Sequence, residues 1–391
     1  MASLHPVNIN KPIEKIHPDN LPDATHDDLA NGLTNIVIQS SEDPDVSTHI
    51  HAHMHFLSKV PGIHALVPGI EKLAAEYHVG NFVIVRGSEE PFFESMPLYA
   101  RIGMHLLFYG REQVKILGTK RIEELLKEQS IKQGQIYDSP QSVQSIPSFV
   151  ETYSIQTDEL LEPDISKYKS FNDFFTRKLK PGARPVEKED DYLNICSAAD
   201  CRLTVYPTVD LAKQFWVKGR HFDIPNLLNL SPSSPQAQTY KDASLAIFRL
   251  APADYHRFHS PIDGVIGETE TIPGQCYTVN PQAVNEPGFD VFTANGRSIL
   301  YLKHAPTGLP VAFVAIGALL VGSVIWTGGQ KKGESIKRGE ELGYFAYGGS
   351  TVVVVFPKGV IEFDSDLWTH SQKPIETLVK VGYSIGKTPS A

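Results

Sequence analysis

Residues 350–356, Ser-Thr-Val-Val-Val-Val-Phe, decide the fold class of this chain. Valine and threonine are β-branched, and such side chains pack well on a pleated strand but lose rotamer freedom in a helix. Two glycines, Gly348 and Gly349, stand directly before the run. The stretch therefore predicts a glycine turn that enters a β-strand at Ser350.

Similar short apolar runs continue outward from this strand, over about residues 195–391. They include Leu245–Phe248 and Val311–Ile316, and they alternate with Gly, Pro and Asp turns, which is typical of strands. Two stretches, 260–274 and 332–345, share a Gly-punctuated plan that is similar to hairpins of lipoyl- and biotinyl-type barrel sandwiches. The sequence therefore predicts a β-rich, barrel-sandwich-like catalytic core over residues 190–391.

One uncharged segment, Leu309–Trp326, has the minimum length of a transmembrane helix. However, Gly317 and Gly322 interrupt it, and it is rich in Val and Ile. We interpret it as two buried strands.

The N-terminal part has a different pattern. Residues 1–55 are polar and rich in Pro, which is typical of a poorly ordered leader. Residues 56–189 are predicted to be helical and to pack on the core or dock on a membrane, because Leu98, Ile102 and Leu106 follow helical spacing. The predicted fold class is therefore α+β, a helical N-terminal region on a β-rich core.

One helix of this region has clear boundary signals. Ser170 is a predicted N-cap, and Pro181-Gly182 is the predicted stop. Between them, Phe171, Phe174 and Phe175 lie on one side, and we expect this stripe to face the core. The nearby basic residues are candidates for contacts with lipid headgroups, and they are Arg177, Lys178, Lys180 and Arg184.

Composition narrows the function classes. The 391 residues are 41% hydrophobic and 21% charged, which is globular composition for two domains or one extended domain. A net charge of -9 argues against nucleic-acid binding. The three cysteines are few and show no CxxC spacing, which indicates a protein without a disulfide framework. The start lacks the apolar run of a signal peptide, so we expect an intracellular protein that is not secreted.

Four residues are candidates for catalysis: Asp200, His256, His259 and Ser350. Asp, His and Ser in this order also fit a serine hydrolase. However, a hydrolase of the α/β type places its serine in a GxSxG elbow between strand and helix, whereas Ser350 is followed by a strand. Gly349 leaves the backbone free to adopt strained angles, which an attack of Ser350 on the preceding carbonyl would need.

Four alternating histidines, His49, His51, His53 and His55, would share one face of a strand and could chelate a metal. They adjoin the predicted leader. We interpret them as non-functional or packing residues and expect no metal site.

Several motifs, in order, resemble the phosphatidylserine decarboxylase family, and the likeness covers about residues 95–387. The motifs are Ser170-Phe-Asn-Asp-Phe-Phe-Thr-Arg-Lys-Leu-Lys-Pro-Gly-Ala-Arg-Pro185, Ala199-Asp-Cys-Arg202, Arg249-Leu-Ala-Pro-Ala-Asp-Tyr-His-Arg-Phe-His-Ser-Pro-Ile-Asp-Gly264, Tyr344-Phe-Ala-Tyr-Gly-Gly-Ser-Thr351 and Glu376-Thr-Leu-Val-Lys-Val-Gly-Tyr-Ser-Ile-Gly386. Many members have Leu-Gly-Ser-Thr at their cleavage site. The Gly-Gly-Ser-Thr of this chain resembles the eukaryotic-type branch and also related fungal decarboxylases of free amino acids.

The resemblance implies a precursor that cleaves itself between Gly349 and Ser350. In the family, the histidine that matches His259, oriented by the aspartate that matches Asp200, takes the proton of the serine. That serine attacks the preceding carbonyl, and elimination and hydrolysis turn it into a covalent pyruvoyl group, the cofactor. The new C-terminal fragment, residues 350–391, is then expected to stay bound to the rest of the chain.

The implied reaction is decarboxylation of phosphatidylserine to phosphatidylethanolamine at a membrane surface. The pyruvoyl ketone accepts electrons as CO2 leaves, and His256 is the candidate general acid, since histidine titrates near neutral pH. The alternatives are a decarboxylase of a free amino acid such as tryptophan and a barrel-sandwich binding module without activity. The expected partners are the phospholipid, a peripheral membrane surface and the cleaved fragment, and a homo-oligomer is left open.

Overall fold

The computed structural model describes residues 80–88, 90–95, 131, 134–215, 217, 222–275, 277, 279, 284, 290–317, 324–328, 331–346, 350–373 and 375–390. The strands are β1 (Gly80–Val85), β2 (Phe92–Ser95), β3 (Asn194–Cys196), β4 (Cys201–Tyr206), β5 (Ser244–Leu250), β6 (Arg257–His259), β7 (Gly264–Ile272), β8 (Arg297–His304), β9 (Pro310–Ile316), β10 (Val324–Trp326), β11 (Ser335–Ile336), β12 (Glu341–Phe345), β13 (Ser350–Phe356), β14 (Glu362–Phe363), β15 (Glu376–Val379) and β16 (Ser384–Lys387). The helices are η4 (Pro140–Ser145), α8 (Ile146–Tyr153), η5 (Thr157–Glu159), η6 (Ile165–Lys167), α9 (Phe171–Phe175), α10 (Val209–Phe215), α11 (Ile224–Leu227), α12 (Pro235–Thr239), α14 (Val291–Ala294) and α15 (Ser365–Ser371).

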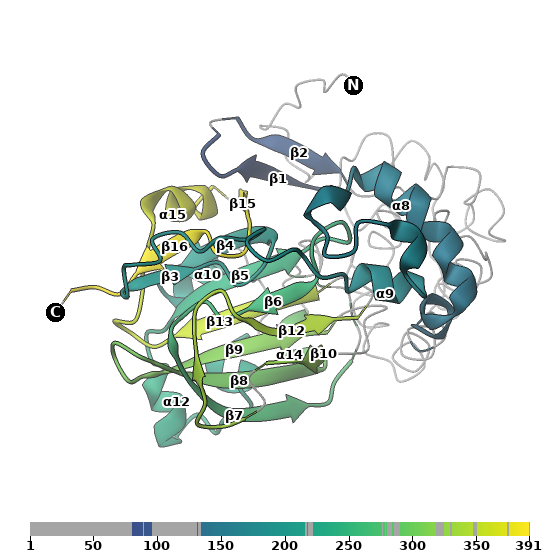
Figure 1. Cartoon of the computed structure of the whole chain (residues 1–391). Helices are drawn as coiled ribbons and strands as arrows, with labels where there is room; N and C mark the ends of the chain where they lie inside the picture. The colour runs from purple at the N-terminus through teal and green to yellow at the C-terminus, as the bar shows by residue number, and fades with distance from the viewer. Residues whose placement is uncertain are drawn as a thin grey trace, which may run out of the picture.

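A ten-stranded sheet dominates this mixed α+β fold (Figure 1). Its strand order is β11-β7-β8-β9-β13-β5-β4-β15-β1-β2, and two sheets of three strands each, β10-β12-β6 and β14-β16-β3, lie beside it. The β-rich core is thus confirmed. The expected barrel is not found among the described strands, because β11 and β2 end the sheet without pairing with each other. Alternating apolar residues are needed by open sheets and barrels alike, so the pattern could not separate the two.

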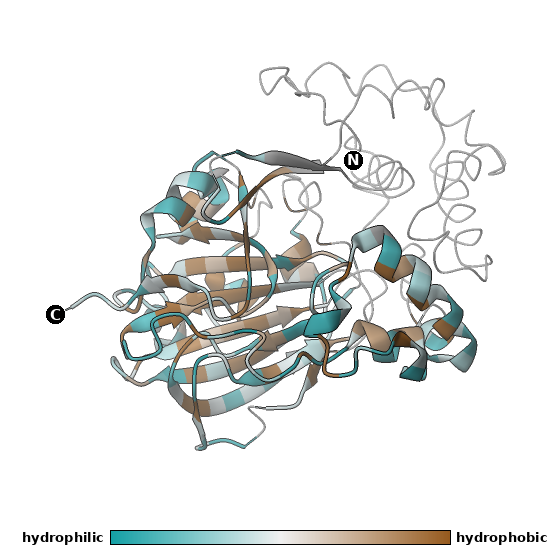
Figure 2. Ribbon diagram, turned by 45° about the horizontal axis from the view of Figure 1, so that its top comes forward, coloured by the Kyte–Doolittle hydropathy of each residue, from teal (hydrophilic) through white to brown (hydrophobic). Residues whose placement is uncertain are grey.

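The valine run forms the middle of this sheet. Strand β13 is antiparallel to β5 on one side and to β9 on the other, with Val353 opposite Ile247 and Val314. All seven residues of β13 are buried, and apolar residues line the neighbouring strands (Figure 2). A strand covered on both faces needs side chains that pack well on a pleated surface, which explains the β-branched sequence.

The two Gly-punctuated stretches prove to be neighbours. β7 comes from the first and β11 from the second, and they pair with each other, with Ser335 opposite Val265. The uncharged segment Leu309–Trp326 contains the buried strand β9 and the half-buried strand β10, as predicted. No helix among the described residues is both long and apolar enough to cross a membrane.

An aromatic module, residues 134–179, lies beside the sheet, and its helices α8 and α9 pack together (Figure 1). Ser170 caps α9 as predicted, since its hydroxyl accepts a hydrogen bond from the amide of Asp173 at 3.1 Å. The three phenylalanines of α9 are fully buried, so the prediction that they face the core is confirmed. The helix ends at Phe175, earlier than the predicted stop, and the residues just after it, Thr176 and Arg177, bond to Arg257 and Ala253 of the β-rich core.

The helical character of the N-terminal region is not confirmed as a whole. Residues 80–95 form β1 and β2, and β1 runs parallel to β15 from the far end of the chain. Residues 1–79, with the leader and the four histidines, lie outside the described residues. The expected helix around Leu98 and Ile102 lies outside them as well.

The segment after residue 349 takes part in two of the three sheets. β13 lies between β5 and β9, β15 lies between β1 and β4, and β16 pairs with β3. All of these partner strands come from the part of the chain before Ser350. Hydrogen bonds of the sheets therefore hold residues 350–387 in place independently of the peptide bond before Ser350.

Replacement of Phe149 by alanine should lower the free energy of unfolding by about 3–5 kcal/mol, the usual cost of removing a buried ring. Phe149 is fully buried and its ring centroid lies 5.0 Å from that of Phe171 and 6.2 Å from that of Phe174. Tyr192→Ala is the control, because Tyr192 is 68% exposed and its removal should change stability by less than about 0.5 kcal/mol. Equal urea midpoints of the two variants would contradict the packing described for the module.

Candidate active site

Ser350 is the first residue of β13 and pairs with Leu250, the last residue of β5. Its side chain is fully buried, and its hydroxyl has no hydrogen-bond partner among the described residues. A buried hydroxyl without a partner costs about 1–3 kcal/mol, so such groups are uncommon and call for a reason. Gly348 and Gly349 lie outside the described residues.

The sheet topology brings the histidine motif to the same end of the core. His259 lies on β6 and His256 directly before it, and β6 pairs with β12. The amide of Phe345 donates to the carbonyl of His256 at 3.0 Å. The motif follows β5 by a short loop, residues 251–254, and β12 ends at Phe345, shortly before Ser350 in the sequence.

His259 is held by one backbone group and one side chain. Its Nδ1 lies 2.8 Å from the carbonyl oxygen of Gly339, and its Nε2 lies 3.3 Å from the hydroxyl of Tyr255. A carbonyl oxygen can only accept, so Nδ1 carries the proton of the neutral ring and Nε2 presents its lone pair. Burial lowers the pKa of His259, while the bond to Gly339 and the charges of Glu341 and Asp200 act in the opposite direction.

His256 is fully buried, and its Nδ1 lies 2.9 Å from the carbonyl oxygen of Asp254. By the same reasoning Nδ1 is the protonated nitrogen. The ring of Phe175 packs against the imidazole at a centroid distance of 4.0 Å. His256 is thus oriented by a carbonyl on one side and a ring on the other.

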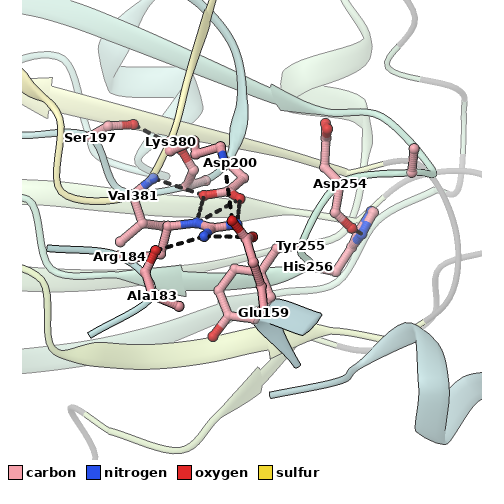
Figure 3. A network of polar contacts seen from close by, with 12 residues as sticks. Glu159, Ala183, Arg184, Ser197, Asp200, Asp254, Tyr255, His256, Lys380 and Val381 are labelled. Carbon is pink, nitrogen blue, oxygen red and sulfur yellow. Dashed lines mark hydrogen bonds and ion pairs between the residues drawn. The ribbon is translucent and has the colours of Figure 1, made fainter. Parts of the chain in front are cut away.

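Asp200 is engaged in a different network (Figure 3). Its carboxylate accepts from Nε and Nη2 of Arg184, the latter at 2.7 Å, and from the amide of Val381 at 2.8 Å. Arg184 also pairs with Glu159 at 2.9 Å. Among the described residues, no hydrogen bond joins Asp200 to His259, so its action on this ring is electrostatic and the orienting contacts come from Gly339 and Tyr255.

Some contacts of the site were not foreseen from the sequence. Gly339 acts through its carbonyl group, which leaves no side-chain signal. Tyr255 lies inside the quoted histidine motif, and its hydroxyl was the one available clue. Arg184 was interpreted as part of a basic patch, because a lone arginine after Pro181-Gly182 does not reveal its partner.

The basic patch proposed for lipid headgroups needs correction. Arg177 is 4% exposed, and the side chain of Arg184 is 11% exposed and paired with Asp200. Only Lys178 and Lys180 of this set are exposed. The aromatic stripe is also buried, because both it and the two arginines fasten the module to the core.

The Arg184–Asp200 pair should be important for stability. Removing one partner of a buried ion pair typically costs about 3–5 kcal/mol, because the other charge stays buried. Arg184→Gln should therefore lower the free energy of unfolding by about that amount, measured with urea in a Ser350→Ala background so that all samples share one covalent state. Lys167→Gln is the control, since its pair with Glu162 is exposed and should contribute little to stability. Similar losses in the two variants would contradict a structural role for the buried pair.

Comparison with protein families matches residues 171–387 to the phosphatidylserine decarboxylase family. The chain is 44% identical over 296 residues to phosphatidylserine decarboxylase proenzyme 2 of Komagataella phaffii, an alignment that covers 76% of this chain and 28% of that protein. The identity to the proenzyme 2 of Oryza sativa subsp. japonica is 44% over 288 residues, with 73% of this chain and 45% of the relative covered.

A bacterial relative is closer in length. The phosphatidylserine decarboxylase proenzyme of Fusobacterium nucleatum is 39% identical over 253 residues, which are 65% of this chain and 81% of that protein. The chain thus spans between about a quarter and a half of the eukaryotic relatives that it matches, but most of the bacterial one. Since the family match covers more than half of the chain and includes all four candidate residues, this chain belongs to the phosphatidylserine decarboxylase family.

Proposed function

We propose that this chain is the precursor of a pyruvoyl-dependent enzyme that cleaves itself before Ser350 and then converts phosphatidylserine to phosphatidylethanolamine and CO2. Family membership supports the reaction, and the names of the relatives, which are called proenzymes, support the processing. The proposal places Ser350, His259, His256 and Asp200 in one site.

The observation that carries the proposal is the buried hydroxyl of Ser350, which has no hydrogen-bond partner in the part of the chain that the structure describes. Conversion to a pyruvoyl group would replace the hydroxymethyl side chain by a methyl group, which needs no hydrogen-bond partner. The surroundings of Ser350 therefore suit the product better than the serine. When present, the pyruvoyl group supplies an electron sink for the loss of CO2.

Self-cleavage begins at the hydroxyl of Ser350. Its oxygen attacks the carbonyl carbon of Gly349, and the peptide bond between the two residues is exchanged for an ester. Loss of the Cα proton of residue 350 then expels the carboxylate of Gly349 and leaves a dehydroalanine. Addition of water to the dehydroalanine then releases ammonia and leaves the keto group.

His259 is the base in this scheme. Its Nε2 presents a lone pair because Nδ1 is bound to the carbonyl of Gly339, and burial favours the neutral form that can accept a proton. The hydroxyl of Tyr255 lies 3.3 Å from Nε2. A hydroxyl both accepts and donates, so Tyr255 can pass a proton toward His259.

His256 serves the later step, in which the carbon that has lost CO2 is protonated. The carbonyl of Asp254 holds its Nδ1, so Nε2 is the atom that exchanges a proton with the reaction. Separate anchoring of the two histidines, one on Gly339 and the other on Asp254, supports separate roles for them.

Phosphatidylserine is preferred to a free amino acid as the substrate because the relatives compared above are named for it. A lipid substrate implies peripheral contact with a membrane inside the cell. Leu161 is 54% exposed, and its amide is bonded to the carbonyl of the exposed Lys178, so this pair is a candidate for that contact. The residues around Leu98 that were also proposed lie outside the described part of the chain.

Intact-mass analysis and product detection test the function together. The purified protein should contain a fragment of residues 350–391 that begins with a pyruvoyl group, and Ser350→Ala should stay intact. The processed enzyme should release CO2 from dispersed phosphatidylserine far faster than from free serine or tryptophan.

His256→Ala is the informative control, because it should cleave but lose about 10²–10⁴-fold in decarboxylation. An intact wild-type chain would contradict the processing. Release of CO2 from free tryptophan but not from the lipid would show that the substrate is the amino acid and not phosphatidylserine.

The rate of self-cleavage should depend on pH through His259. The base must be neutral, and burial lowers its pKa below the ordinary value of 6.5, so the rate should fall as the pH is lowered, with a midpoint below pH 6.5. The measurement follows fragment formation after refolding of the precursor at several pH values. Glu341→Gln should move the midpoint further down, because the charge of Glu341 raises the pKa of His259. A midpoint at or above pH 6.5 would argue against His259 as the base.

A further inference from the structure

We propose that Arg177 is a positioning residue for His256, because it fixes the carbonyl group that orients the imidazole. The proposal rests on the proposed function, which gives His256 its role in decarboxylation. The end of α9 would then orient His256, which explains why the aromatic module is attached to the core at this point.

Arg177 is a buried arginine that binds backbone carbonyls rather than a carboxylate. Its Nη2 donates to the carbonyl of Ala253 at 2.9 Å and to that of Asp254 at 3.0 Å. It forms no ion pair with a carboxylate within the described ranges, and its side chain lies over the ring of Phe174 at 5.2 Å. Burial lowers the pKa of Arg177 to about 10, so the side chain remains charged at neutral pH.

Burying a charge without a paired carboxylate is costly, because few groups replace the lost water. Such an arrangement is retained where the geometry that it imposes is needed. The two carbonyls that Arg177 binds belong to one short loop, residues 251–254, between β5 and the histidine motif. Both bonds come from Nη2, whose two N–H groups are fixed in the plane of the guanidinium, so they hold the two adjacent carbonyls more rigidly than a rotatable ammonium could.

The carbonyl oxygen of Asp254 is shared by Arg177 and His256. It accepts from Arg177 and also from Nδ1 of His256, at 3.0 and 2.9 Å. The carboxylate of the same residue pairs with Arg202 and accepts from the amide of Ala251 at 2.6 Å. Both ends of Asp254 are therefore fixed, so its carbonyl cannot turn away from the imidazole.

The end of α9 makes two further contacts with the histidine motif. Phe175 packs on the ring of His256, and Nε of Arg257 donates to the carbonyls of Thr176 at 2.9 Å and Arg177 at 3.3 Å. The ring of Phe175 contacts the imidazole directly, and the guanidinium of Arg177, from the same short segment, acts on it through the carbonyl of Asp254. This segment fixes both the protonated nitrogen and the plane of the ring.

Direct binding of the substrate headgroup is a different role for Arg177, and the structure disfavours it. Arg177 is 4% exposed, and among the described residues its contacts are with backbone carbonyls and Phe174. A headgroup ligand would raise KM when it is removed, whereas a positioning residue for His256 would lower kcat. The two roles therefore predict different kinetics.

Arg177→Gln and Arg177→Lys in the full-length protein test the proposal. Arg177→Gln should still cleave itself, since His259 is anchored on Gly339, but its kcat for decarboxylation should fall on the order of 10²-fold with little change in KM. Arg177→Lys keeps a charged donor and should recover part of this loss. Side-chain ¹⁵N NMR of histidine-labelled protein, with the His256 signals assigned by His256→Gln, should show a Nδ1-protonated ring in the wild type and a mixture of tautomers in Arg177→Gln.

Arg297→Gln is the matched control. Arg297 is also buried and also binds backbone carbonyls, but these include Leu227 and Asn226 of α11 and none of the histidine motif. It should leave kcat per processed molecule and the His256 signals unchanged. A similar fall of kcat in Arg297→Gln would show that any lost buried arginine has this effect, and would overturn the proposal.

Other outcomes are equally decisive. A normal kcat and an unchanged His256 tautomer in Arg177→Gln would overturn the proposal, and so would a raised KM with kcat unchanged. Should Arg177→Gln fail to fold, Arg177→Lys allows the same comparison. A wild-type enzyme without decarboxylase activity would refute the proposed function, but the NMR signals would still decide whether Arg177 fixes His256.

Discussion

The fold depends on strand β13 being paired on both sides, directly after the bond at which we propose cleavage. Antiparallel hydrogen bonds to β5 and β9 hold the backbone from its first residues onward. A serine at the free end of a loop would move away after cleavage, whereas one at the beginning of a central strand stays where it is. The seven buried residues of β13 therefore serve the chemistry as much as the core.

The histidines of the site are controlled mainly by backbone carbonyls. Gly339 and Asp254 each accept from Nδ1 of one histidine, which leaves Nε2 as the reactive atom in both rings. A carbonyl cannot change its protonation state, so it fixes the tautomer at every pH at which the ring is neutral. A carboxylate in the same place would add a charge and stabilise the imidazolium instead. This arrangement suits His259, the proposed base, which must be neutral when it accepts a proton.

The sequence could predict elements whose signals are local. The valine run, the glycines before Ser350 and the N-cap at Ser170 each act within a few residues, and the strand and the cap lie where they were expected. Other features depend on partners far along the chain. They are whether the sheet closes into a barrel, where α9 ends and whether β1 and β2 form. For Asp200 and Arg177, the sequence shows the residue types but not their partners. Nothing in the sequence distinguishes an arginine that binds a carbonyl from one that faces water.

Asp200 would have a second role in a chain that is cut into two pieces, as we propose. Its carboxylate receives Arg184 and the amide of Val381, which belongs to the C-terminal fragment. Arg184 in turn pairs with Glu159 of the aromatic module. One carboxylate thus links the core, the module and the fragment, while its charge acts on His259 through space. Loss of Asp200 would remove the electrostatic effect and a junction between three parts at once. A defect in cleavage after replacement of Asp200 would therefore have two physical causes. An analogy with a catalytic triad considers only the effect on His259 and leaves out the buried pair with Arg184.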